Sequence, residues 1–151
     1  MSQVSRNIGH SKKAHTMTAE AKTLSTSINR SAEATYAFVS NPEHFSQWAA
    51  GLGASLQPTA EKNTWQVTTP EGLAKVRFVE KNQFGVVDHY VSLSTGVEVY
   101  VPLRVLANNQ GSEVMLTVFR LPGMTDDEFK RDTDAVQKDL HTLKGLLEGG
   151  E

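Results

Sequence analysis

The sequence predicts an α+β fold in which a curved antiparallel sheet of about seven strands wraps around one long C-terminal helix, with two short helices after the first strand. Three observations support this fold class. Segments in which apolar and polar residues alternate recur from residue 22 to about residue 121. The breaks between the later segments are short and rich in Gly, Asn and Pro, which favours hairpins over helical crossovers. The C-terminal segment instead repeats apolar side chains at helical spacing.

The chain of 151 residues fits one ordinary domain and is long enough to bury a substantial core. Residues 1–21 are polar and lack periodicity, so we expect a flexible leader there. Residues 22–149 contain every periodic segment. We therefore expect a single domain over residues 22–149.

The first alternating segment starts near Lys22 and places Leu24, Thr26 and Ile28 on one side, as a half-buried strand requires. Ser31 then stands where a helix cap is expected, directly before "AEATYAFVSN". The pair Asn41-Pro42 starts a second short helix, "PEHFSQWA", because proline suits a first helical position. Two short helices are predicted after the first strand.

The middle of the chain predicts a meander of antiparallel strands. Its turn-like breaks are "TPEG", "KNQF", "STG" and "NNQG". The expected strands are the segments "GASLQP", "NTWQVTT", "GLAKVRFVEK", "GVVDHYVSL", "VEVYVPLRVLA" and "SEVMLTVFRL".

The C-terminal helix has clear signals at both ends. Thr125 can cap it, and Glu128, three residues later, can complete a capping box. Gly149 and Gly150 end it. One stripe of apolar side chains, interrupted by Thr133, is formed by Phe129, Val136, Leu140, Leu143 and Leu147.

Composition excludes several classes of function. A formal net charge of −2 gives no electrostatic basis for binding nucleic acid or an anionic membrane, and the apolar runs are too short to span a bilayer. The absence of cysteine excludes disulfides and thiolate sites, and cytoplasmic localisation is expected. No metal or other cofactor is predicted, because the histidines are scattered, at His10, His15, His44, His89 and His141.

The element order resembles the START-like, or helix-grip, superfamily, which includes polyketide cyclases and dehydrases and lipid-transfer domains. The resemblance rests on the opening "SINRSAEATYAFVSNPEHFSQWA", the meander and the helix "DDEFKRDTDAVQKDLHTLKGLLE". It covers residues 22–148 and implies a START-like ligand-binding domain with a cavity between sheet and helix. Members of this superfamily bind apolar or amphipathic molecules, and some cyclise, dehydrate or hydrolyse them. One departure is that Asn29-Arg30-Ser31 stands where proline is frequent in the superfamily.

The cavity lining depends on which residues share a face of the sheet. If Thr95-Gly96 forms a two-residue hairpin loop, the opposed pairs are His89 with Pro102, Val91 with Tyr100 and Val87 with Arg104. The candidate cavity residues are then Trp48, Trp65, Phe78, His89, Tyr100, Arg104, Met115 and Phe119. We expect His89 to point inward, and Asp88 to point outward beside Lys75 and Arg77. If the other face is concave, the buried polar set is Asp88, Tyr90 and Arg120.

Three functions follow from these expectations. The first is a noncatalytic module that binds, carries or senses a hydrophobic or amphipathic small molecule. The second is a cyclase-, dehydratase- or hydrolase-like enzyme with His89 as general acid or base, aided by Tyr100 or Arg104. The third is a homodimer or partner-binding module that uses Val99, Val101 and Leu103 as an exposed apolar stripe.

Overall fold

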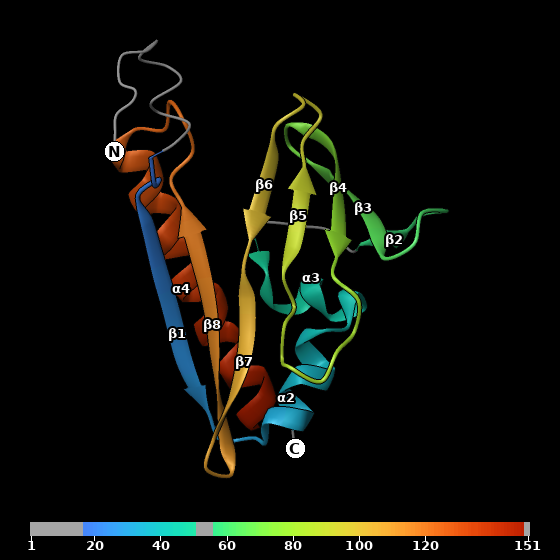
Figure 1. Cartoon of the computed structure of the whole chain (residues 1–151), viewed down its shortest axis with the longest axis vertical. Helices are drawn as coiled ribbons and strands as arrows, with labels where there is room; N and C mark the ends of the chain where they lie inside the picture. The colour runs from blue at the N-terminus through green and yellow to red at the C-terminus, as the bar shows by residue number, and fades with distance from the viewer. Residues whose placement is uncertain (1–16, 51–55, 150–151) are drawn as a thin grey trace, which may run out of the picture.

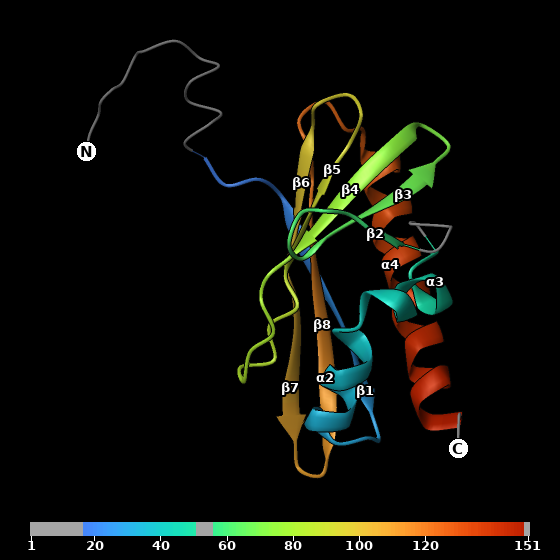
Figure 2. The same cartoon turned by 90° about the vertical axis from the view of Figure 1, so that its right-hand side faces the viewer.

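The computed structural model describes residues 17–50 and 56–149. These form a sheet with all helices on one side of it (Figures 1 and 2). The strands are β1 (Ala21–Ile28), β2 (Gln57–Pro58), β3 (Thr64–Thr69), β4 (Gly72–Phe78), β5 (His89–Ser92), β6 (Glu98–Val101), β7 (Leu103–Asn108) and β8 (Gly111–Phe119). The helices are α2 (Ala32–Val39), the 3₁₀ turn η1 (Pro42–His44), α3 (Phe45–Trp48) and α4 (Asp126–Gly149).

The sheet consists of two parts that meet at Pro102. Three strands pair in the order β1-β8-β7, and five pair in the order β2-β3-β4-β5-β6. All pairings are antiparallel. Beside the junction, the amide of Thr117 in β8 donates to the carbonyl of Pro102 at 3.1 Å. Beyond that bond β6 and β8 diverge (Figure 1).

The caps predicted for the helices are present. The Ser31 hydroxyl accepts a hydrogen bond from the Ala34 amide at 3.1 Å, and Asn41 accepts one from the Glu43 amide at 3.0 Å. At α4, the Thr125 side chain accepts from the Glu128 amide while the Glu128 carboxylate accepts from the Thr125 amide. These bonds satisfy amides that a helix start leaves unpaired.

The apolar stripe of α4 packs on the sheet. Phe129, Leu140, Leu143 and Leu147 are buried, and the three leucines join a core that includes Leu24 and Ile28 of β1. Thr133, predicted as an interruption, is also buried; its hydroxyl donates to the carbonyl of Lys130 within the helix. A hydroxyl satisfied in this way can enter an apolar face without an unpaired polar group.

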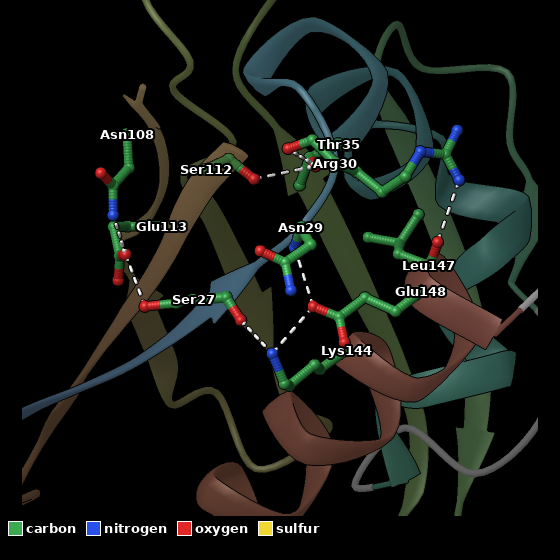
Figure 3. Close-up of polar contacts among 10 residues, drawn as sticks. All are labelled: Ser27, Asn29, Arg30, Thr35, Asn108, Ser112, Glu113, Lys144, Leu147 and Glu148. Atoms are coloured by element: carbon green, nitrogen blue, oxygen red, sulfur yellow. Dashed lines mark hydrogen bonds and ion pairs between the residues drawn. The ribbon is translucent and has the colours of Figure 1, made fainter. Parts of the chain in front are cut away.

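A polar cluster fastens the C-terminal end of α4 to the end of β1 (Figure 3). Lys144 donates to the carbonyl of Ser27 at 2.6 Å and pairs with Glu148 at 2.8 Å. The same Glu148 carboxylate accepts the amide of Asn29 at 2.7 Å. Arg30 donates to the carbonyl of Leu147, one of the last that the helix leaves free. This end of the molecule is closed by hydrogen bonds.

Two predicted strands differ from the structure. The segment "VEVYVPLRVLA" divides into β6 and β7 because Pro102 has no amide hydrogen for the ladder. The segment "GVVDHYVSL" becomes a strand only at His89; before it, Val86 forms an isolated bridge with Arg104. Of "GASLQP", residues 53–55 lie outside the described residues, and Gln57–Pro58 form β2.

The register predicted for the β5–β6 hairpin was wrong by one residue. The loop has three residues, not two: Leu93 donates to the carbonyl of Val97, and Gly96 has φ +94°. A left-handed residue at the last loop position is typical of three-residue hairpins. His89 therefore faces Val101, Tyr90 faces Tyr100 and Val91 faces Val99. Because side chains alternate, this shift moves every following residue of β6 to the other face.

Gly85 is required by its surroundings. Its φ is +75°, and a Cβ placed there would lie 2.1 Å from the carbonyl oxygen of Val105. The carbonyl of Gly85 also accepts the Val105 amide at 2.8 Å, so the loop cannot retreat without losing that bond.

We predict that Gly85→Ala lowers the free energy of unfolding by about 2–4 kcal/mol, because it combines left-handed backbone strain with a backbone clash. Urea unfolding followed by circular dichroism measures the change. Gly145→Ala is the control: Gly145 lies in α4 with open space around it, so alanine there is expected to stabilise by about 0.5–1 kcal/mol. Equal stability of the Gly85→Ala and unchanged proteins would contradict the prediction.

Candidate functional site

A largely apolar cavity of about 270 Å³ lies between the diverging half of the sheet and α4. Its sheet wall comes from β5, β6 and β8, and its helical wall from α3 and α4. The inward residues of the sheet wall alternate with outward ones, as a pleated sheet requires. They include Val91, Val99, Val101, Leu116 and Val118.

The divergence of β6 and β8 makes room for the cavity. The two strands are not paired beyond Pro102, and an aromatic contact connects β6 with β8 instead. Tyr100 of β6 and Phe119 of β8 stack with ring centroids 6.0 Å apart, and both residues contribute to the cavity lining. Across the cavity, Asp132 and Ala135 of α4 are exposed and mark its mouth.

His89 is the buried titratable group of the sheet wall. It is 5% exposed, and its ring lies 5.6 Å from that of Phe45 and 5.1 Å from that of Phe78. The Nδ1 atom lies 3.0 Å from the carbonyl of Val87, which can only accept, so the proton is on Nδ1. Nε2 has no hydrogen-bond partner among the residues described.

The environment keeps the His89 imidazole neutral. Burial lowers the pKa of His89 below its ordinary value, and this outweighs the Val87 carbonyl and the charge of Asp88, which both raise it. A neutral imidazole with its proton on Nδ1 has a lone pair on Nε2. Within the cavity, His89 therefore acts as a hydrogen-bond acceptor or proton acceptor.

Asp88, the neighbour of His89, belongs to the other face. Its buried carboxylate accepts two hydrogen bonds from the guanidinium of Arg104, at 2.9 and 2.8 Å. It also accepts the Leu103 amide at 2.9 Å and the Tyr100 hydroxyl at 2.9 Å. Burial raises the pKa of this carboxyl, but the hydrogen bonds from Arg104, Leu103 and Tyr100 outweigh burial and hold the pKa below its ordinary value.

Two aspartates of α4 form part of the helical wall. Burial raises the pKa of Asp139, whose carboxylate accepts the Ala50 amide at 3.2 Å. Partial burial also raises the pKa of Asp132, although that residue as a whole is exposed. Our sequence reasoning missed both. Their spacing was the available signal: Asp132, Ala135, Val136 and Asp139 are separated by three, one and three residues, which defines one helix face beside the apolar stripe.

Trp48 provides a hydrogen-bond donor at the helical wall. The residue is 3% exposed, lines the cavity and packs on Phe45 with ring centroids 5.1 Å apart. Its Nε1 atom is buried and has no partner within the described part of the chain. A buried indole N–H normally finds an acceptor.

The eight sequence-predicted candidates are only partly brought together. Trp48, His89, Tyr100 and Phe119 line the cavity. Phe78 lies behind His89 in the core, and Trp65 shares its sheet face without reaching the cavity. Arg104 and Met115 are opposed on the convex face. The register error explains this, because the misaligned β6 assigns Arg104 and Met115 to the inward face.

The alternative polar set does not form a second site. Tyr90 stacks on Tyr100 with centroids 5.0 Å apart, and the guanidinium of Arg77 lies 4.5 Å from the Tyr90 ring centroid. Arg120 pairs with Glu20 and Asp126 near the start of α4. We expected Asp88 to lie beside Lys75 and Arg77, but the structure pairs it with Arg104. Arg77 instead faces Glu98, with 3.7 Å between Nη2 and Oε2.

The apolar stripe predicted as a dimer surface is not exposed. Val99 and Val101 line the cavity, and Leu103 is 0% exposed. Within residues 17–50 and 56–149, no group of three His, Asp or Glu side chains is arranged to hold a metal. No helix in the same ranges is long and apolar enough to cross a membrane.

The chain resembles solved structures in fold. No protein-family model matches the sequence, and no curated protein matches it at a significant level. DynU16, from the dynemicin biosynthetic locus, aligns with TM-score 0.67 and 14% identity over 87% of this chain and 48% of its own, so this chain spans about half of DynU16. A START superfamily protein from Mycobacterium smegmatis aligns with TM-score 0.63 and 13% identity over 87% of this chain and 99% of its own.

A third similar structure is the Aha1 dimer from Colwellia psychrerythraea, with TM-score 0.66 and 15% identity over 87% of this chain and 98% of its own. Identities this low establish the fold alone. The expected START-like, helix-grip fold is confirmed.

We predict that His89 makes stability depend on pH near neutrality. A histidine whose pKa is lowered by folding contributes stability that is complete above its unfolded pKa of about 6.5 and is lost as the pH falls, at up to about 1.4 kcal/mol per pH unit. Urea unfolding between about pH 5 and 7.5 should show a shallower slope for His89→Gln than for the unchanged protein. His141→Gln, at an exposed position of α4, is the control and should keep the original slope. Identical slopes in all three proteins would refute the neutral, buried state of His89.

We predict that Asp88→Asn costs about 2–4 kcal/mol of unfolding free energy at neutral pH, because it removes a buried charge that accepts four hydrogen bonds. Since folding lowers the pKa of Asp88, its contribution is present above about pH 4 and is lost in more acidic solution, so the variant should lose less stability there. Thermal unfolding across that range measures both effects. Glu98→Gln alters the exposed pair with Arg77 and a hydrogen bond from the Ser92 hydroxyl; it is the control and should change stability by less than about 1 kcal/mol. A control-sized effect of Asp88→Asn would contradict the role of this carboxylate.

Proposed function

We propose that this protein binds a hydrophobic or amphipathic small molecule in the cavity between β5, β6, β8 and α4. The observation that carries the proposal is the cavity itself: most of its lining residues are apolar, and the few with polar side-chain atoms are His89, Trp48, Tyr100, Thr117, Asp132 and Asp139. Small-molecule sites typically combine an apolar lining with a small number of polar groups that fix orientation.

The size of the cavity limits the ligand. Its volume of about 270 Å³ equals about nine liquid-water volumes, so a molecule with on the order of ten non-hydrogen atoms fits inside. A longer molecule would extend through the mouth beside Asp132 and Ala135. Lipid-, polyketide- and aromatic-like molecules are all compatible with such a lining. The START superfamily protein and the protein of the dynemicin locus support a ligand-binding proposal through their shared fold only.

A second candidate function is catalysis in the same cavity with His89 as the proton acceptor. It is favoured by one observation: a neutral imidazole whose Nε2 has no partner within the described residues, in a largely apolar cavity. The predicted helpers are not available for it, because the Tyr100 hydroxyl and the Arg104 guanidinium are both bonded to Asp88. Binding of a ligand without catalysis needs no such helper residues, so it remains the leading proposal.

A cavity-filling variant tests the binding proposal. N-phenyl-1-naphthylamine fluoresces in apolar sites, and its titration should give a saturable increase with the unchanged protein. Ala135→Trp places an indole at the cavity mouth and is expected to weaken binding by about tenfold or more.

The matched control is Gln137→Trp, which adds the same side chain to an exposed position of α4 outside the lining. It should bind the probe as the unchanged protein does. Equal probe binding by both tryptophan variants, or no saturable binding by the unchanged protein, would overturn the proposal.

A further inference from the structure

The cavity contains more free hydrogen-bond acceptors than donors. Two of its polar side chains are already engaged: the Tyr100 hydroxyl donates to Asp88, and the Thr117 hydroxyl bonds to that of Thr23 at 2.7 Å. The remaining acceptors are the Nε2 lone pair of His89, the Asp132 carboxylate and the lone pairs of Asp139 that the Ala50 amide does not use. An occupant can satisfy these only by donating hydrogen bonds.

Among the described lining residues, the one unpartnered donor is too buried to contact a ligand. The Nε1 hydrogen of Trp48 is buried without a partner in the described part of the chain. A hydroxyl, ammonium or N–H group on the ligand can donate to one of the acceptors. A carboxylate can only accept, so it would leave His89 Nε2 unsatisfied.

The charge of the cavity lining also disfavours a carboxylate ligand. Asp132 and Asp139 are the charged side chains at the wall, and no lysine or arginine occurs among the lining residues that the structure describes. Arg131 and Lys138 act on these carboxylates from the same helix, but neither lines the cavity. An anionic ligand group near these carboxylates would be repelled, because charges interact more strongly in a partly buried site than in water.

We propose that the cavity selects apolar molecules whose polar end donates a hydrogen bond and carries no negative charge, which makes alcohols and amines its ligand class and excludes fatty-acid-like anions. This inference rests on the proposed function. His89, Asp132 and Asp139 determine the selection, and the apolar wall of β5, β6 and β8 holds the rest of the ligand.

A matched series of ten-carbon probes tests the selection. Decanol, decylamine and decanoate share a chain and differ in the polar end. Each displaces N-phenyl-1-naphthylamine from the full-length protein at neutral pH, below the concentration at which the probe forms micelles. Decanol and decylamine are expected to bind at least about tenfold more tightly than decanoate. Methyl nonyl ether, a neutral ten-carbon isomer of decanol that only accepts hydrogen bonds, should bind more weakly than decanol.

The double variant Asp132→Asn/Asp139→Asn assigns the effect to these carboxylates. It should bind decanoate more tightly and decylamine more weakly than the unchanged protein does, with decanol little changed. Asp134→Asn is the control: Asp134 lies on the same helix, is exposed, and pairs with Lys130 outside the cavity. It should leave the order of the probes unchanged.

A salt titration tests the same charges without a substitution. Raising NaCl to about 0.5 M shortens the screening length and should narrow the difference between decylamine and decanoate in the unchanged protein. Decanoate binding as tightly as decanol, or a double variant that folds and keeps the full preference, would overturn the selection while leaving the binding function intact. Failure of every probe, including N-phenyl-1-naphthylamine, would overturn the binding function and this inference together.

Discussion

The Asp88 carboxylate joins the two parts of the sheet, and the cavity depends on it. Pro102 ends β6 and cannot donate to a neighbouring strand, so the chain needs another contact where β7 begins. The Asp88 carboxylate provides this contact by accepting hydrogen bonds from the Leu103 amide and from Nε and Nη2 of Arg104. The same carboxylate holds the Tyr100 hydroxyl, and the Tyr100 ring stacks on Phe119 of β8. One buried charge therefore holds both the junction at Pro102 and the stacked pair of Tyr100 and Phe119.

The two ends of the molecule are built for different purposes. At the C-terminal end of α4, Lys144 and Glu148 bind the backbone of β1 directly, and Arg30 caps the helix (Figure 3). These contacts close that end. At the other end, β6 and β8 have no ladder between them, and apolar side chains face α4 across the cavity. Hydrogen bonds hold α4 to β1 at one end of the molecule. At the opposite end β6 and β8 can therefore stay apart while α4 remains packed on β1.

Local sequence signals predicted the helices and strands, but the length of one hairpin loop limited the prediction of which residues face the cavity. Ser31, Thr125 and Glu128 identified helix starts, because capping depends only on residues close in sequence. The strand alternation correctly placed Phe78 on the same face of the sheet as His89. The face of Arg104 and Met115 depended on whether the hairpin at Gly96 has two or three residues in its loop, a difference that the residues "STG" do not settle. The partner of Asp88 could not be predicted either, since Arg104 reaches it only in the correct register.

The alternation of one strand separates two neighbouring titratable groups into two roles. Asp88 points to the convex face, where Arg104 compensates its charge, while His89 points to the cavity among Phe45 and Phe78. Asp88 raises the pKa of His89, but burial of the imidazole outweighs this and lowers it. Had the pair shared a face, a hydrogen-bonded carboxylate would stabilise the imidazolium and give the cavity a charged donor. Their separation instead gives the cavity a neutral acceptor, and this is why a ligand that donates a hydrogen bond suits it.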